Sequence, residues 1–142
     1  MYVLKTNSSF DSADFLSGYK GKCSNIHGHR WKVEIQVKGE KLKEDVQNKG
    51  MLVDFGQLKE DLGKVTEELD HTFIMEKGSL KDATLEALKG EGFAIVEMEF
   101  RPTAENLSKY FFDKMSDIGY DVLLATVYET PNNCASYNVT WS

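Results

Sequence analysis

The sequence predicts an α+β domain in which antiparallel strands carry helices on one face. Residues 29–39 alternate between apolar and polar side chains, which is the period of a half-buried strand. Residues 55–69 repeat apolar side chains at helical spacing, the pattern of an amphipathic helix packed on a core. The chain of 142 residues has the length of one domain, residues 1–142, and its 41% hydrophobic residues exceed what a disordered polar chain carries.

The first half of the chain alternates strands and loops before its helix. Residues 2–10 read as a strand, and the Gly, Ser and Asn content of residues 17–26 indicates a loop. The next strand places its apolar residues on one side: Trp31, Val33, Ile35 and Val37. After a polar turn, residues 51–53 are expected to form a returning strand. Asp54 then stands at the N-cap position of the helix.

The second half contains a further helix and the last strand. Thr103 stands at the N-cap position of that helix, which turns Leu107, Tyr110, Phe111 and Met115 inward. The remaining expected elements are an exit from the helix over residues 70–76, a short helix over 80–89, a strand over 93–99, a long strand over 121–129 and an edge piece over 135–141. A sheet of about four strands with two helices on one face leaves its other face open, so we expect self-association.

Charge and composition exclude several classes of function. A net charge of -6 argues against non-specific binding to nucleic acid or to an anionic membrane. No apolar run is long enough to span a bilayer, and the N-terminus has no apolar signal region, so we expect a cytoplasmic protein. Cys23 and Cys134 lie far apart, and in such a protein they are expected to be free thiols.

The tripeptide His27-Gly28-His29 is a candidate metal site. Two imidazoles two residues apart on a strand point to the same side and can reach one ion. The alternative is a pair of surface histidines near the start of a strand. A catalytic zinc site needs a third protein ligand, for which the Asp14 carboxylate is a candidate, although taken alone Asp14 reads more readily as a solvated loop residue.

Three further places could carry proton transfer or recognition. Cys23 precedes His27 by four residues, where a nearby metal or cation would favour its thiolate, although a lone cysteine is more commonly a small buried residue. Asp70 could orient His71, or His71 could simply cap a helix C-terminus. Glu129, at the end of the last strand, could accept two hydrogen bonds from a 2-amino-pyrimidinone edge, or it could be an exposed glutamate.

Taken together, these segments resemble the tetrahydropterin synthase family, of the 6-pyruvoyl and 6-carboxy branches. The motifs that match, in chain order, are FDSADFL (10–16), CSNIHGH (23–29), LVDFGQL (52–58), ELDH (68–71), RPTAEN (101–106) and VYET (127–130). The resemblance implies the tunnelling fold, in which subunits join their sheets into a barrel, usually as a homohexamer of two trimers. It also implies 7,8-dihydroneopterin triphosphate as the substrate.

The resemblance also implies roles for individual residues. Zinc would be held by three histidines, two of which match His27 and His29. The implied proton-transfer groups are Cys23, Asp70 and His71, and the implied pterin anchor is Glu129. Thr103 and Glu105 match a motif that lies near the substrate at the subunit interface.

One departure from the family pattern concerns the first zinc ligand, which is a histidine in the family and Asp14 here. Aspartate can ligate zinc, but it is shorter than histidine, and its charge should make the ion a weaker Lewis acid. The compact chain and the CSNIHGH segment favour the branch that releases acetaldehyde and triphosphate and leaves 6-carboxy-tetrahydropterin, on the route to queuosine. The alternatives are the 6-pyruvoyl branch and a pterin-binding homologue whose catalysis is impaired by Asp14.

Overall fold

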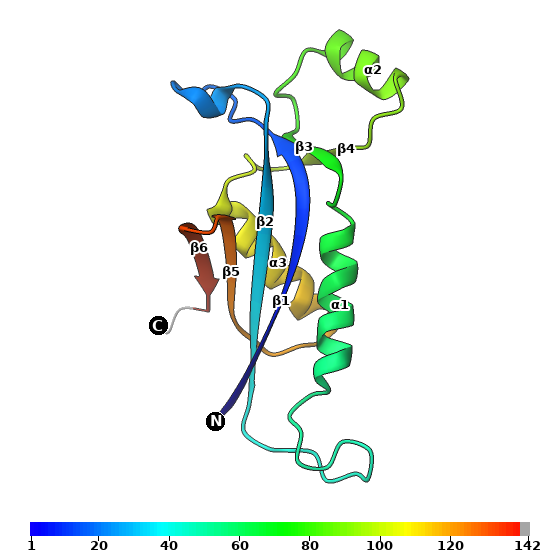
Figure 1. Ribbon diagram of the computed structural model, residues 1–142, viewed down its shortest axis with the longest axis vertical. Helices are drawn as coiled ribbons and strands as arrows, with labels where there is room; N and C mark the ends of the chain where they lie inside the picture. Colours follow the sequence, from blue (N-terminus) through cyan, green and yellow to red (C-terminus); the bar gives the residue numbers. More distant parts are fainter. Residues whose placement is uncertain (140–142) are drawn as a thin grey trace.

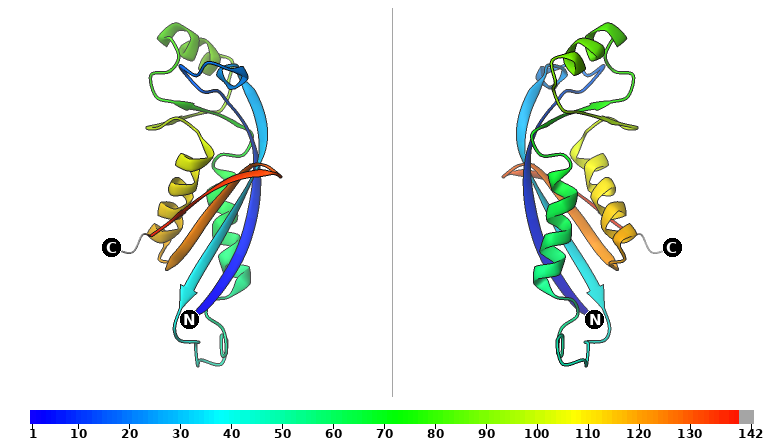
Figure 2. Two further views of the ribbon diagram at one scale, coloured as in Figure 1. Left: turned by 90° about the vertical axis from the view of Figure 1, so that its left-hand side faces the viewer. Right: turned by 90° about the vertical axis from the view of Figure 1, so that its right-hand side faces the viewer.

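The computed structural model describes residues 1–139, which form one curled six-stranded sheet with two helices packed on one side (Figures 1 and 2). The strands are β1 (Tyr2–Asp14), β2 (His27–Gly39), β3 (Thr72–Glu76), β4 (Ile95–Met98), β5 (Val122–Thr130) and β6 (Asn133–Asn138). The helices are α1 (Phe55–Glu67), α2 (Asp82–Gly90) and α3 (Ala104–Ile118), and a short 3-10 turn, η1 (Lys22–Ser24), precedes β2.

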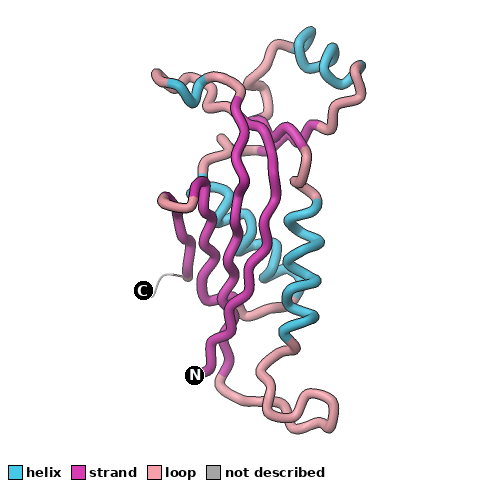
Figure 3. Tube along the Cα trace, viewed as in Figure 1, coloured by secondary structure: helices cyan, strands magenta, loops and turns pink. Residues whose placement is uncertain are grey.

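The sheet has the strand order β4-β3-β1-β2-β5-β6, which Figure 3 shows as the magenta layer. Strands β1, β2, β5 and β6 pair antiparallel, as expected. The short strands β3 and β4 add to the edge of β1 in parallel, so the prediction of a four-stranded antiparallel sheet is incomplete. Periodicity could not identify β3 because five residues directly after a helix are too short to show a strand period.

The helices begin where the sequence predicts. The Asp54 carboxylate accepts the Gly56 N–H at 2.7 Å, and the Thr103 hydroxyl accepts the Asn106 N–H at 3.2 Å. Both helices cover one face of the sheet, where Phe10 and Trp31 pack against their apolar sides. Helix α2 buries none of its side chains and lies beyond β3 and β4 (Figure 1).

Two of the predicted strands differ in extent or do not form. Strand β1 continues four residues past the expected end, to Asp14, because its pairing with β2 runs over all 13 residues of each strand. The expected returning strand over residues 51–53 is wrong: these residues belong to a loop, in which Met51 O accepts the Lys43 N–H at 2.8 Å. Of the expected edge piece 135–141, residues 140 and 141 lie outside the described residues.

The other expected elements are confirmed, including the short helix and the last long strand. Cys23 and Cys134 are both free. Within residues 1–139, none of the helices combines the length and the apolar character that crossing a membrane requires.

Candidate active site

Three candidate ligands meet at one end of the β1–β2 ladder. Asp14 lies directly opposite His27 in the register, and His29 shares the face of His27 because side chains two residues apart on a strand point the same way. The potential ligand atoms of the three side chains all lie within 4.8 Å of one another. The short reach of an aspartate is sufficient here because its strand neighbour is the first histidine itself.

The polar atoms of this cluster face one another without forming hydrogen bonds. His27 Nδ1 donates to the Asn25 carbonyl at 2.7 Å, which leaves the lone pair on Nε2 free to ligate. That Nε2 lies 3.1 Å from Asp14 Oδ1, without hydrogen-bond geometry. Asp14 Oδ1 and His29 Nε2 are buried and have no hydrogen-bond partner within residues 1–139. Buried polar atoms are rarely left unpaired, so this arrangement suits an ion between them.

Burial shifts the pKa values of Asp14 and His29 toward their neutral forms, as expected for buried ionisable groups. Desolvation raises the pKa of Asp14 to about 6; His27 opposes this rise, and the nearby Glu129 carboxylate adds to it. Desolvation also lowers the pKa of His29, against the effect of the Glu129 charge. A divalent cation would favour both the carboxylate and the neutral imidazole. Two imidazole nitrogens and one carboxylate oxygen form a donor set that zinc accepts.

The hydrophobic core packs against the candidate ligands through Trp31. The indole N–H of Trp31 donates to Ser12 Oγ at 2.9 Å, and both residues are buried. The rings of His29 and Trp31 meet edge to face, with centroids 5.3 Å apart. The residues beneath the candidate ligands are therefore fixed by packing, which limits the rotamers that His29 can adopt.

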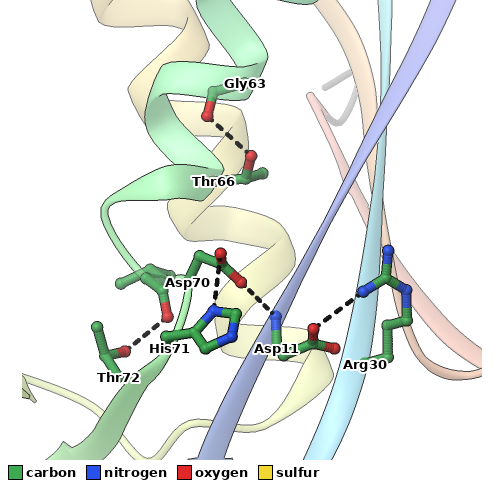
Figure 4. Close-up of polar contacts among 8 residues, drawn as sticks. Asp11, Arg30, Gly63, Thr66, Asp70, His71 and Thr72 are labelled. Atoms are coloured by element: carbon green, nitrogen blue, oxygen red, sulfur yellow. Dashed lines mark hydrogen bonds and ion pairs between the residues drawn. The ribbon is translucent and has the colours of Figure 1, made fainter.

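The Asp70–His71 pair is held by the backbone of Asp11 (Figure 4). Asp70 Oδ1 accepts the Asp11 N–H at 2.8 Å, and Asp70 Oδ2 lies 2.9 Å from His71 Nδ1. The backbone N–H of His71 donates to the Asp11 carbonyl at 2.6 Å. The hydrogen bonds that Asp70 accepts, from the Asp11 N–H and from the His71 ring, lower the pKa of Asp70, so that its carboxylate stays charged beside the imidazole. The pair thus has the geometry of an imidazole oriented by a carboxylate.

His71 has a left-handed backbone, with φ of 58°, the only non-glycine residue in the described part of the chain to do so. Such a conformation costs free energy and persists where surrounding contacts enforce it. His71 lies at the end of the short segment between α1 and β3, and its side chain points outward and is 79% exposed. His71 and His29 line one shallow depression of about 410 Å³, together with Asp11 and Gly28.

Of the other predicted site residues, only Glu129 makes a polar contact with the cluster within residues 1–139. Cys23 is half-buried in η1, and its carbonyl accepts the Leu16 N–H at 2.7 Å, which fixes the loop. The Thr103 hydroxyl is used as the cap of α3, and Glu105 is exposed in the first turn of that helix. Glu129 is brought to the cluster: its Oε1 lies 3.1 Å from His29 Nε2.

Sequence reasoning missed Asp11, whose backbone holds both members of the proton-transfer pair. Its side chain pairs with Arg30 on the helix-free face of the sheet, with Asp11 Oδ2 and Arg30 Nη1 3.0 Å apart. The signal that could have found this pair is the strand register, which places the two opposite charges directly across from each other.

Comparison with known proteins agrees with this architecture. Residues 3–140 match the family model described as 6-pyruvoyl tetrahydropterin synthase. A protein of Haemophilus influenzae named 6-carboxy-5,6,7,8-tetrahydropterin synthase is 30% identical over 96% of this chain and 99% of its own length. A protein of the same name from Aquifex aeolicus is 33% identical over 82% of this chain and 75% of its own length.

Solved structures confirm the tunnelling fold. The 6-pyruvoyl tetrahydropterin synthase of Caenorhabditis elegans superposes with a TM-score of 0.68 at 24% identity, over 98% of this chain and 96% of that chain. The enzyme of the same name from Plasmodium falciparum gives a TM-score of 0.70 at 19% identity, over 96% of both chains. With a family model spanning residues 3–140 and a relative 30% identical over nearly the full length of both chains, this chain belongs to the 6-pyruvoyl tetrahydropterin synthase family.

Proposed function

We propose that this protein is a zinc-dependent lyase that converts 7,8-dihydroneopterin triphosphate to 6-carboxy-5,6,7,8-tetrahydropterin, releasing acetaldehyde and triphosphate. The observation that carries the proposal is the convergence of Asp14, His27 and His29 within 4.8 Å in a member of this family. The relatives that match over nearly their whole length bear the name of this reaction's product, which supports the 6-carboxy branch and a place in queuosine biosynthesis.

The ion would be Zn²⁺, held by Asp14, His27 and His29. When bound, zinc supplies a Lewis acid that polarises the hydroxyls of the substrate side chain. The tautomer of His27 is already correct, because its Nδ1–H is engaged by the Asn25 carbonyl. Asp14 contributes a charge that a histidine would not, and this charge should lower the electrophilic strength of the site.

The proton-transfer groups would be Cys23 and the Asp70–His71 pair. The Cys23 thiolate removes a proton from the side-chain carbon next to the polarised hydroxyl, and His71, oriented by Asp70, returns one. Glu129 holds the amino and ring N–H groups of the pterin, which places the reacting carbons between these residues. Thr103 and Glu105 would lie beside the substrate where two subunits meet.

The assembly that we propose is a homohexamer, formed as a dimer of trimers. The helix-free face of the sheet is polar and carries ion pairs such as Lys32–Glu34 at 3.4 Å, so this face does not require an apolar cover. The outer edges of β4 and β6, at the two ends of the strand order, supply the stronger reason to associate. Unpaired strand edges favour joining neighbouring sheets into a closed barrel. Sedimentation equilibrium on the purified protein tests the copy number.

A second candidate function is favoured by Asp14 itself. If its carboxylate weakens the site too far, the protein would be a pterin-binding homologue that keeps Glu129 and the oligomer but turns over poorly. The 6-pyruvoyl branch, which eliminates triphosphate and keeps the carbon skeleton of the side chain, is the other alternative.

One incubation separates these functions. Purified zinc-loaded protein is mixed with 7,8-dihydroneopterin triphosphate, and the products are identified by mass spectrometry, with acetaldehyde trapped as a hydrazone. The proposal expects 6-carboxy-tetrahydropterin and an equal amount of acetaldehyde. A 6-pyruvoyl product without acetaldehyde would assign the other branch, and tight binding without turnover would identify the impaired homologue.

A further inference from the structure

The Glu129 carboxylate enters the cluster of Asp14, His27 and His29 from the neighbouring strand. Strand β5 runs antiparallel to β2 with Tyr128 opposite Lys32, and Glu129 shares the core-facing side of Val127. In the β5–β6 pairing, Glu129 is the extra residue of a bulge between Tyr128 and Thr130. Bulges commonly re-aim a side chain next to a functional site.

Glu129 and His29 form a close ion-pair contact in which the buried His29 nitrogen lacks full hydrogen-bond geometry. Glu129 Oε1 lies 3.1 Å from His29 Nε2, yet this buried nitrogen has no hydrogen-bond partner within residues 1–139. The Asp14–His27 pair has the same separation, 3.1 Å, and Asp14 Oδ1 is likewise unpartnered. Two ligands on a tetrahedral zinc, each about 2.0–2.1 Å from the ion, lie about 3.3–3.4 Å apart. Both separations are slightly shorter than this spacing, and Glu129 is near His29 but outside the group of three ligand atoms that lie within 4.8 Å of one another. The exposed Glu129 side chain would therefore have to turn toward Asp14 and His27 to join them on one ion.

We propose that Glu129 is the fourth ligand of the metal site in the resting enzyme, and that the ion and the pterin ring compete for its carboxylate. This inference rests on the proposed function and extends it. Two imidazoles and two carboxylates balance the charge of a divalent cation and complete a four-coordinate shell, so the resting site is closed. Glu129 leaves the shell when it accepts the N–H groups of the ring, and the site then gains the open position that zinc catalysis requires.

The departure at position 14 gives this arrangement a physical reason. A shell with two carboxylates holds the ion more tightly than one carboxylate would, which offsets the loss of a third imidazole. The same Glu129 side chain is 37% exposed, so an incoming ring can reach it without opening the core. Ring recognition and the opening of the metal site thereby become one event.

Metal binding tests the first half of the inference. Protein freed of metal by a chelator is titrated with Zn²⁺ against a competing chromophoric chelator, for the natural protein, Glu129→Gln and Glu34→Gln. Glu34 faces the opposite side of the sheet and pairs with Lys32, so it controls for the loss of one carboxylate. The expected result is at least tenfold weaker zinc binding for Glu129→Gln, comparable to losses seen when metal-site support is removed, and no change for Glu34→Gln. Equal affinity of all three proteins would overturn the inference.

Cobalt spectroscopy tests the competition. The Co²⁺-loaded natural protein is mixed with pterin, the ring without its side chain, and its visible absorption is recorded. We expect the spectrum to shift toward that of Co²⁺-loaded Glu129→Gln, whose own spectrum does not respond to pterin. If Glu129→Gln loses pterin binding while its zinc affinity and cobalt spectrum match the natural protein, Glu129 is an anchor only, and the inference fails while the proposed function stands. If the natural protein binds no Zn²⁺, both fail.

Discussion

The two candidate reactive regions of this molecule differ in how completely the chain's own groups satisfy their polar atoms. At the Asp14–His27–His29 cluster, buried atoms face one another without hydrogen bonds, and each unsatisfied group costs roughly 1–3 kcal/mol. At the Asp70–His71 pair, the Asp11 N–H donates to Asp70 and the Asp11 carbonyl accepts the backbone N–H of His71. The Asp70 carboxylate in turn contacts the imidazole. The first region leaves buried polar atoms unpaired, whereas the second is held by hydrogen bonds, so they should respond to different perturbations.

The largest expected effect is the loss of metal from the first region alone. The double variant His27→Ala/His29→Ala should fall from one zinc per chain to none in elemental analysis, because two of the proposed ligands are gone. His71→Ala is the control and should keep its zinc, since His71 is directed outward. Loss of zinc from both variants would show that the two regions are not independent.

The second region should control turnover without affecting metal content. His71→Ala removes a general acid, a change worth about 10²–10⁴ in rate. We expect kcat to fall by that factor while KM and zinc content stay near their natural values. Asp70→Asn should also lower kcat, because both Asp70 oxygens face donors, the Asp11 N–H and His71 Nδ1, and asparagine has only one acceptor oxygen. A large rise in KM with kcat unchanged would contradict the assignment of His71 to chemistry.

The pH dependence of stability should separate the regions again in the metal-free protein. The pKa of Asp14 is raised to about 6 from an ordinary value of 3.8, so the folded state binds a proton more tightly than the unfolded state. Stability from this group is present below about pH 4 and is lost as pH rises through 6. Relative to Asp14→Asn, the natural protein should lose roughly 2 kcal/mol between pH 4 and pH 7.

Urea unfolding of both proteins at the two pH values measures this difference. The Asp70 carboxylate changes stability in the opposite direction: its lowered pKa supplies stability above its ordinary value, and this stability is lost on acidification. An identical pH profile for the natural protein and Asp14→Asn would show that Asp14 is not perturbed by its burial.

The smallest expected effect is a gain. Asp14→His should retain zinc several-fold longer against a chelator and turn over several-fold faster, because a neutral imidazole leaves the ion more electrophilic. Both quantities are measured side by side with the natural protein. If neither rises, the carboxylate at this position is already a fully competent ligand or does not ligate at all, and zinc retention by Asp14→Ala then distinguishes these cases.

The sequence predicted the long elements of the fold better than the short ones. Period-two alternation identified β2, and Asp54 and Thr103 marked the helix starts, because these signals are local. Strand β3 was missed and β4 is shorter than the expected 93–99, because five and four residues carry little periodicity. The parallel pairing of β3 with β1 and of β4 with β3 depends on tertiary contacts.

For the site, the residue types were predictable and the contacts were not. The approach of Glu129 to His29 depends on a bulge in β5, and the hold of Asp11 on Asp70 and His71 depends on which strand passes beneath the end of α1. Neither the bulge nor the position of that strand can be inferred from the residue types alone. The roles of Cys23 and Glu129 as base and anchor stay predictions.

The unbroken 13-residue register between β1 and β2 has a consequence for substitutions at position 14. A slip of one residue would turn Asp14 away from His27. It would also carry Phe10, which is 1% exposed in the native register, out of the core. Packing of the core therefore also holds residue 14 opposite His27. Whichever side chain stands at position 14 is presented at that same point, so a substitution there changes the local chemistry without a change of fold.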